Sequence, residues 1–185
     1  MSNTLDLSTY NHSFSLKNKI LRLVWNCIRL ILFRPFASRL FKKWRVLVLK
    51  CFGAKIDWSS HIYASVKIWA PWNLEIGKNS SLGPTVDCYN QGRISIGDNT
   101  VISQKTYLCA STHDYSQKDF PLILKPISIG NGVWIAADAF IGPGVSIENN
   151  AVIAARAVVI KKVEENTVVG GNPAKTIKLN RQLEL

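Results

Sequence analysis

Residues 127–163 read ISIGNGVWIAADAFIGPGVSIENNAVIAARAVVIKKV, and a single spacing runs through the whole stretch. An aliphatic side chain returns every six positions, at Ile129, Ile135, Ile141, Ile147, Ile153 and Val159. A small or β-branched residue follows four positions after each of these, at Val133, Ala139, Val145, Ala151, Ala157 and Val163. A helix would repeat every ~3.6 residues and a half-buried strand every ~2 residues, so neither explains the pattern. A sustained period of six predicts a solenoid of short stacked strands.

The same period occurs upstream in three shorter groups. The repeated positions are Ile56, Ile62 and Ile68, then Ile76, Leu82 and Cys88, then Ile96, Ile102 and Leu108. Two-residue insertions separate the groups, and the segments 74–77, 94–97 and 127–130 each begin a new one. Three hexapeptides make one triangular coil of roughly eighteen residues, so we expect stacked coils around a continuous aliphatic column. Corner glycines follow the repeated aliphatics, where a tight turn favours a residue without Cβ: Gly77, Gly97, Gly130 and Gly142.

Three motifs give the chain a family resemblance. They are residues 89–99 (YNQGRISIGDN), 103–115 (SQKTYLCASTHDY) and 171–175 (GNPAK). With the repeats, they make residues 56–178 resemble the hexapeptide-repeat acyltransferases, and within them the colanic-acid-type exopolysaccharide O-acetyltransferases. The resemblance implies a left-handed parallel β-helix, although general rules for parallel crossovers favour the right hand. It also implies a homotrimer that transfers acetyl from acetyl-CoA to a sugar hydroxyl of a surface or exopolysaccharide precursor.

We expect three parts in the chain: a basic helical cap (1–53), a β-helix (54–169) and a closing motif with a short helix (170–185). The net charge is +11, and residues 1–50 contribute +9 of it, with ten Lys or Arg against one acid, Asp6. The nearly neutral remainder disfavours nucleic-acid binding. The apolar segment 21–33 is too short to span a bilayer and no signal-peptide pattern is present, so we expect a cytoplasmic protein. Four scattered cysteines are interpreted as buried thiols.

Residues 15–33 are predicted to form an amphipathic helix, followed by a second helix over 36–52. Its apolar stripe comprises Leu16, Ile20, Leu23, Val24, Cys27, Ile28, Ile31 and Leu32. Two interpretations stay open. The stripe can pack on the open first coil as a solenoid cap, which we favour, or it can rest on an anionic membrane surface.

The segment 112–126 breaks the six-residue phase and is expected to leave the coil as a loop. At its base lies His113, whose imidazole is the type of group that takes a hydroxyl proton near neutral pH. The family resemblance favours this catalytic role over a purely structural one. Acceptor-binding candidates near it are Asn90, Asp87, Asp114, Tyr89 and Tyr115. Among these, Asp87 could instead orient the histidine or stabilise a turn, and Asp114 could shape the loop.

Coenzyme A would lie along coil corners that small residues keep smooth. The candidates for its arm are Ala136, Ala137, Ala154 and Ala155, with Trp134 beside the thioester. Lys161, Lys162 and Lys175 are candidates for the nucleotide phosphates. Asn172 and Pro173 belong to the family's closing motif, or simply end the coil. Related enzymes often carry Gly-Ser where this chain has Ala155-Arg156, so Arg156 either meets a phosphate or displaces the coenzyme.

Two other functions compete with acetyl transfer. A non-catalytic β-helix scaffold would bind a membrane or partner protein without needing coenzyme A. A zinc-dependent hydratase would need three converging histidines, and His12, His61 and His113 occupy unrelated repeat positions. We therefore predict no metal site.

Overall fold

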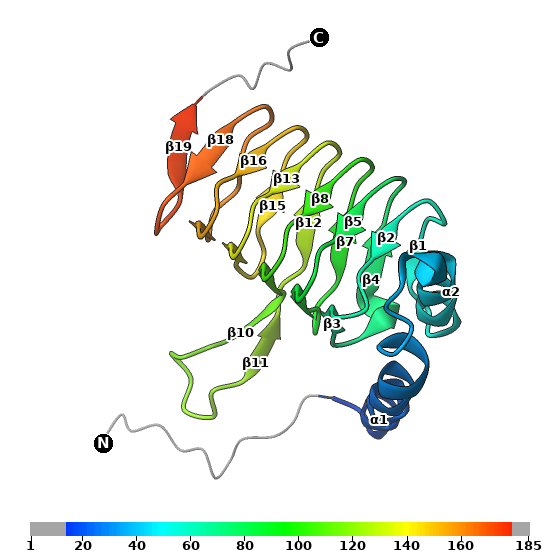
Figure 1. Cartoon of the computed structure of the whole chain (residues 1–185). Coiled ribbons are helices and arrows are strands. Elements are labelled where there is room, and N and C mark those ends of the chain that lie inside the picture. The colour runs from blue at the N-terminus through cyan, green and yellow to red at the C-terminus, as the bar shows by residue number, and fades with distance from the viewer. Residues whose placement is uncertain (1–13, 179–185) are drawn as a thin grey trace.

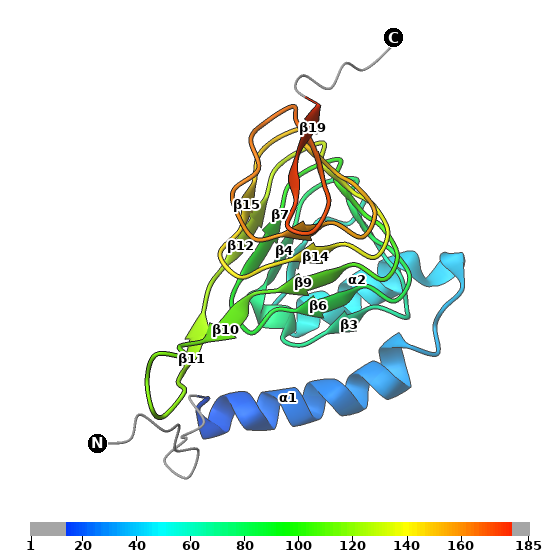
Figure 2. The ribbon, with the colours of Figure 1, turned by 90° about the vertical axis from the view of Figure 1, so that its left-hand side faces the viewer.

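The computed structural model describes residues 14–178 as a triangular parallel β-solenoid with helices at its first coil (Figures 1 and 2). The helical segment comprises α1 (Leu16–Ile28), the π-helical turn η2 (Arg29–Phe33), the 3₁₀ turn η3 (Arg39–Phe41) and α2 (Lys42–Cys51). The solenoid is a left-handed parallel β-helix of about six coils, so the predicted fold class is confirmed. None of the helices in residues 14–178 is both long and apolar enough to cross a bilayer.

Three sheets form the faces of the solenoid, and all their strands are parallel except β19, which is antiparallel to β18. Face 1 contains β1 (Lys55–Ile56), β4 (Leu74–Ile76), β7 (Ile94–Ile96), β12 (Ile127–Ile129) and β15 (Ser146–Ile147). Face 2 contains β2 (His61–Ile62), β5 (Ser81–Leu82), β8 (Val101–Ile102), β13 (Trp134–Ile135), β16 (Val152–Ile153), β18 (Val168–Gly170) and β19 (Lys175–Lys178). Face 3 contains β3 (Lys67–Ile68), β6 (Asp87–Tyr89), β9 (Tyr107–Cys109), β14 (Phe140–Ile141) and β17 (Val158–Val159). A short 3₁₀ turn, η4 (Pro71–Asn73), precedes β4.

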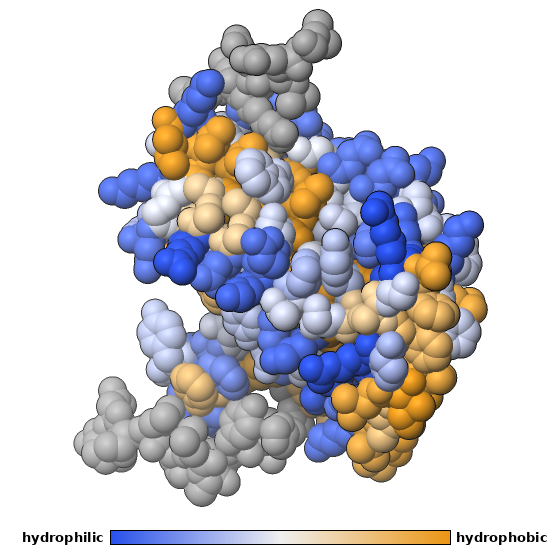
Figure 3. Space-filling model, viewed as in Figure 1, coloured by the Kyte–Doolittle hydropathy of each residue, from blue (hydrophilic) through white to orange (hydrophobic). Residues whose placement is uncertain are grey.

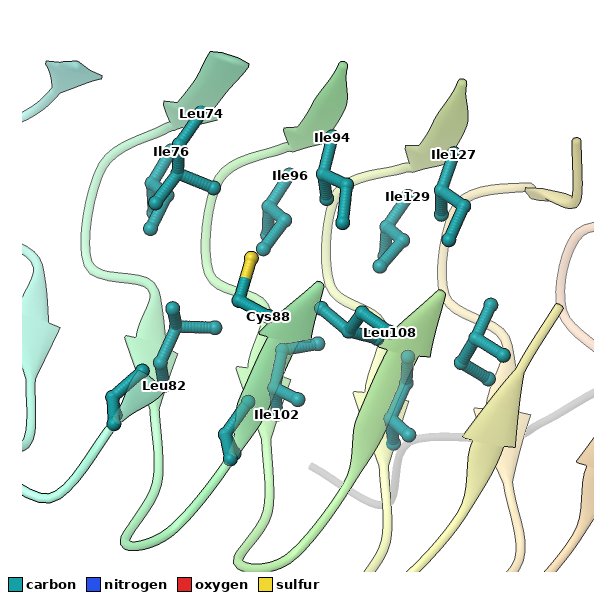
Figure 4. Close-up of a cluster of buried hydrophobic side chains, with 14 of the residues drawn as sticks. Leu74, Ile76, Leu82, Cys88, Ile94, Ile96, Ile102, Leu108, Ile127 and Ile129 are labelled. Atoms are coloured by element: carbon teal, nitrogen blue, oxygen red, sulfur yellow. The ribbon is translucent and has the colours of Figure 1, made fainter. Parts of the chain in front are cut away.

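The repeated aliphatics form the predicted column inside the solenoid (Figure 4). On face 1 the register pairs Ile76 with Ile96, Ile96 with Ile129, and Ile129 with Ile147. The step from Ile76 to Ile96 is twenty residues and the step from Ile129 to Ile147 is eighteen, as the two-residue insertions predict. The coil between them is longer because the segment 112–126 leaves it. Cys88 occupies one aliphatic position, and burial raises the pKa of its thiol.

The corner glycines are required for a different reason from the one expected. Gly77, Gly97 and Gly130 do not have positive φ angles. A Cβ atom added at Gly97 would lie 2.7 Å from the carbonyl carbon of Gly130 in the next coil. The close approach of stacked coils, rather than a turn conformation, excludes a side chain there.

The helical segment closes the open edge of the first coil with hydrogen-bond donors. Trp25 Nε1 donates to the carbonyl of Ile68 (2.8 Å) and Arg45 Nε to the carbonyl of Ile62 (2.7 Å). Lys50 Nζ donates to the carbonyl of Ile56 (3.0 Å). The apolar stripe contributes only Ile28 and Leu32, which are half-buried against the core. Most of it is exposed, so the prediction that it packs on the first coil is wrong.

Two smaller expectations also need correction. The prediction of a C-terminal helix is wrong for residues 175–178, which form β19 and pair antiparallel with β18. Residues 179–185 lie outside the described part. The turn at 171–174 returns the chain alongside the last coil, where strand pairing outweighs helix propensity. All four cysteines are free, but Cys27 and Cys51 are exposed rather than buried.

Candidate active site

The segment after β9 leaves the solenoid as a β-hairpin. Its strands are β10 (Ser111–His113) and β11 (Leu122–Leu124), and His113 pairs with Leu122. The expected loop is therefore an ordered ribbon at its base, visible at the lower left of Figure 1. His113 is the last residue of β10, so backbone pairing fixes where its side chain starts.

The hairpin also fixes the tautomer of His113. Its Nδ1 lies 2.8 Å from the carbonyl oxygen of Phe120. A carbonyl oxygen cannot donate, so Nδ1 must carry the hydrogen when the ring is neutral. The proton-accepting lone pair is then on Nε2. The ring of Phe120 stacks on the imidazole at 4.4 Å and 6° and limits its rotation.

Asp114 holds the hairpin tip in shape. Its carboxylate accepts hydrogen bonds from the Ser116 backbone amide (3.0 Å), the Ser116 hydroxyl (2.5 Å) and Gln117 Nε2 (2.7 Å). These bonds, first that of the Ser116 hydroxyl, lower the pKa of Asp114. Of its two expected roles, the structure supports the loop-shaping one.

A cavity of about 490 Å³ opens beside His113. Its lining comes from α1, the first three coils and the hairpin: Phe14, Arg22, Trp69, Tyr89, Gln91, Cys109, Ser111, Thr112, His113 and Leu122. The lining contains no Asp or Glu among the described residues, and Arg22 is its one charged group apart from the histidine. The Arg22 guanidinium lies 3.7 Å from the ring centroid of Trp69. The cavity is thus lined by aromatic rings, one cation and the candidate base.

Gln91 lines the cavity and carries a buried polar atom. Its side-chain oxygen Oε1 is buried and has no hydrogen-bond partner among the described residues. A buried unpaired oxygen costs stability unless something donates to it. A hydroxyl group of a bound acceptor would satisfy it. No sequence pattern marks Gln91, Arg22, Trp69 or Phe14 as site residues, because they come from separate segments.

The other expected acceptor-binding residues divide between the cavity and its surroundings. Tyr89 lines the cavity, a position that is compatible with contact to an acceptor. Tyr115 stands on the hairpin tip and is exposed. Asp87 lines a neighbouring cavity, where it pairs with Lys67 at 3.4 Å.

Asn90 has a structural position instead. It is fully buried; its Oδ1 accepts from the backbone amides of Trp69 and Ala70, and its Nδ2 donates to the carbonyl of Ala70. These bonds commit the whole amide to joining two coils. The expected contact of Asn90 with the acceptor is therefore not supported.

The residues predicted to bind the arm of coenzyme A lie close together in the structure. Trp134, Ala136, Ala137, Ala154 and Ala155 line one apolar groove of about 530 Å³, with Ser103, Gln104 and Val152. Trp134 Nε1 donates to the Ser103 hydroxyl (3.1 Å), which holds the indole against the corner. Because alanines leave the backbone accessible, this groove fits a long, thin, mainly apolar ligand arm.

The predicted phosphate-binding residues lie elsewhere. Lys161, Lys162 and Lys175 line a second groove of about 370 Å³ at the last coil. Lys162 is already paired with Glu164 (2.9 Å) and Glu148 (3.7 Å). Arg156 does not line the alanine groove and pairs with Asp138 at 3.3 Å.

The closing motif joins the last coil through its backbone. The amide of Ala174, which follows Asn172 and Pro173, donates to the carbonyl of Val158 at 2.8 Å. This placement agrees with the chain-ending interpretation of Asn172 and Pro173.

His113 and the alanine groove sit at different corners of the triangular coil. The groove lies at the corner between faces 2 and 3, where β8, β13 and β16 turn toward β9, β14 and β17. The hairpin leaves from the opposite end of β9, at the corner between faces 3 and 1. One chain therefore presents a candidate base and a candidate donor groove on separate edges.

The residues 14–178 contain no group of three or more His, Cys, Asp or Glu side chains that could hold a metal ion. His61 stands on face 2, where it stacks on Tyr63 and contacts Arg45, away from the cavity of His113. His12 lies outside the described residues.

Comparison with known proteins identifies the family. The model of the bacterial transferase hexapeptide (six repeats) matches residues 126–161. WcaF of Escherichia coli (strain K12), a protein assigned to colanic acid biosynthesis as an acetyltransferase, is 39% identical over 155 residues. The match covers 84% of this chain and 85% of WcaF. This chain belongs to the hexapeptide-repeat acetyltransferases.

Solved structures of hexapeptide-repeat acetyltransferases share its fold. A galactoside acetyltransferase in complex with coenzyme A has a TM-score of 0.80 at 24% identity, covering 92% of this chain and 86% of that one. An acetyltransferase of Vibrio cholerae O1 biovar eltor, complexed with acetyl-CoA, has a TM-score of 0.79 at 23% identity and 94% coverage of both chains. The expected enzyme class, an acyltransferase, is confirmed by the family.

Proposed function

We propose that this acetyltransferase moves the acetyl group of acetyl-CoA to a sugar hydroxyl of a surface or exopolysaccharide precursor, with His113 as general base. The observation that carries the proposal is the bond between His113 Nδ1 and the Phe120 carbonyl, which leaves Nε2 as the proton acceptor beside a cavity suited to a sugar. The names of WcaF and of the E. coli galactoside O-acetyltransferase, 33% identical over 109 residues, support a sugar acceptor. We place the protein in the cytoplasm.

In the proposed reaction His113 Nε2 takes the proton of the acceptor hydroxyl as its oxygen bonds to the thioester carbonyl carbon. The carbon–sulfur bond then breaks, and the imidazolium returns the proton to the leaving thiolate, so the products are the acetyl ester and free CoA. Tyr89 supports the sugar ring, and Trp69 holds the Arg22 guanidinium beside it. Gln91 Oε1 accepts from a second hydroxyl and orients the sugar.

We infer that the working unit is a homotrimer with its sites between subunits. The base and the alanine groove occupy different corners of one chain, so a neighbour must supply the missing half. A threefold rotation presents a different corner of each subunit to the next one and closes the ring. The groove fits the coenzyme arm, and Lys161 and Lys175 at the last coil are candidates for its phosphates.

The proposal is tested first by calorimetric titration with acetyl-CoA and with CoA. We expect saturable micromolar binding with one site per chain. A screen of methyl glycosides, followed by release of free CoA, then identifies an acceptor. His113→Asn should lower kcat roughly 10²- to 10⁴-fold while leaving acetyl-CoA binding unchanged, since a general base contributes a factor of that size.

His61→Gln is the matched control, because His61 lies away from the cavity. A folded protein that binds no acetyl-CoA would favour the non-catalytic scaffold instead. Loss of less than tenfold in kcat for His113→Asn would remove the histidine from the mechanism.

A further inference from the structure

Helix α1 turns its apolar side away from the protein. Residues three and four apart share one side of a helix, and Leu16, Ile20, Leu23 and Ile31 are 73%, 53%, 65% and 63% exposed. The opposite side faces the solenoid, where Trp25 is completely buried. An amphipathic helix at a solenoid end would normally bury its apolar side. Here no residue of the described part, 14–178, covers that side.

The exposure is concentrated rather than scattered. Ten of the large apolar side chains that are exposed in residues 14–178 lie between residues 16 and 47: Leu16, Ile20, Leu21, Leu23, Val24, Leu30, Ile31, Leu40, Phe41 and Leu47. Figure 3 shows apolar side chains gathered over α1 at the lower right of the molecule. Contiguous apolar surface of this kind marks an interaction site.

The same segment is strongly cationic. Residues 14–53 contain ten Lys or Arg and no Asp or Glu. Lys17 and Lys19 are exposed and fall at the two edges of the apolar side, and no described carboxylate forms an ion pair with either. A helix with an apolar face bordered by lysines matches the chemistry of a headgroup layer, where apolar groups enter the acyl boundary and ammonium groups stay among phosphates.

We propose that α1 and the η2 turn that continues it dock on an anionic lipid bilayer, with Leu16, Ile20, Leu23 and Ile31 inserted and Lys17 and Lys19 among the headgroups. Charge decides between a bilayer and a second copy of this chain. A second copy would bring the same cations to the interface and a solenoid that is nearly neutral, whereas an anionic bilayer neutralises the segment.

Docking has a consequence for catalysis that rests on the proposed function. Phe14 and Arg22, from the same helical segment, line the cavity of His113. A bilayer held against the outer side of α1 therefore lies across that helix from the candidate acceptor site. We accordingly assign the acceptor to the class of sugars carried on a lipid, which the docked enzyme meets at the membrane surface.

Vesicle flotation with the full-length protein tests the docking without any substrate. Phosphatidylcholine vesicles containing about a third phosphatidylglycerol should carry the protein, and pure phosphatidylcholine vesicles should carry far less. Leu23→Gln/Ile31→Gln should weaken binding on the order of a hundredfold, since two apolar side chains no longer leave water. Lys17→Gln/Lys19→Gln should weaken it about 25-fold, at roughly fivefold per lysine near an anionic surface.

Ile177→Gln, which changes an exposed apolar residue on β19, is the control and should bind like the wild type. Equal binding by the wild type and Leu23→Gln/Ile31→Gln would overturn the proposal. The proposal would also be overturned if that variant formed smaller oligomers in sedimentation velocity while its flotation stayed unchanged. In that case a second copy of the chain would cover α1. Acetyl-CoA titration of the same samples reports separately on the proposed function.

Discussion

The placement of His113 and the alanine groove on different corners predicts how two inactive variants should behave when mixed. His113→Asn keeps the groove, and Ala155→Phe fills the groove from an exposed position but keeps the histidine. Each variant alone should have almost no activity. In a trimer reassembled at random from equal amounts, a site works when its histidine comes from an Ala155→Phe chain and its groove from a His113→Asn chain. The chance is one half times one half, so about a quarter of wild-type activity should return.

The assay measures CoA release after the two variants are unfolded together in urea and refolded. Folded samples mixed without unfolding are the control and should stay inactive while their subunits do not exchange. Sedimentation velocity must show trimers in every sample. Background activity in reassembled trimers would refute the shared site and would place base and donor groove in one chain.

Two further predictions concern stability. Gly97→Ala should lower the free energy of unfolding by about 1–3 kcal/mol, because its Cβ would overlap the backbone of the next coil. At Gly142 the atom nearest to an added Cβ is 3.2 Å away, so Gly142→Ala should change the free energy of unfolding by less than about 1 kcal/mol. Equal urea midpoints for the two variants would contradict this prediction. His61 has a lowered pKa because of burial and then the nearby Arg45, Lys42 and Arg39. Below its ordinary value of 6.5 the unfolded chain therefore binds more protons than the folded one, and stability should fall from pH 7 toward pH 5.5. Urea unfolding across this range should show a shallower fall for His61→Gln, and an unchanged slope would exclude His61 as the cause.

The solenoid could be predicted closely because each coil repeats one local pattern. The inward position is Ile76, Ile96, Ile129 and Ile147 in successive coils of face 1, so a single spacing fixes both the strands and their register. The C-terminal end escaped prediction because no repeat governs it. Residues 175–178 become a strand through pairing with β18, which is a tertiary effect that local propensity does not report.

The candidate site divides in the same way. His113 and the four alanines follow from where the repeat breaks or where its corners are small, and the structure places the alanines in one groove. Arg22, Trp69 and Gln91 meet at the cavity only after the chain has folded, since they come from α1 and two different coils. Asn90 is as polar as these residues, but its amide forms hydrogen bonds with the backbone of Trp69 and Ala70 and is not available to a ligand.

The orientation of α1 follows from the need of the first coil for hydrogen-bond donors, which the hydrophobicity of the helix does not report. The first coil has no neighbouring strand to pair with its outer carbonyls, and each buried carbonyl without a donor costs about 1–3 kcal/mol. Trp25, Arg45 and Lys50 donate to the carbonyls of Ile68, Ile62 and Ile56, one on each face of the solenoid. Leucine and isoleucine cannot donate. The side of α1 that carries Trp25 must therefore face the coil, and the leucine-rich side is turned outward, where a lipid surface can take it up.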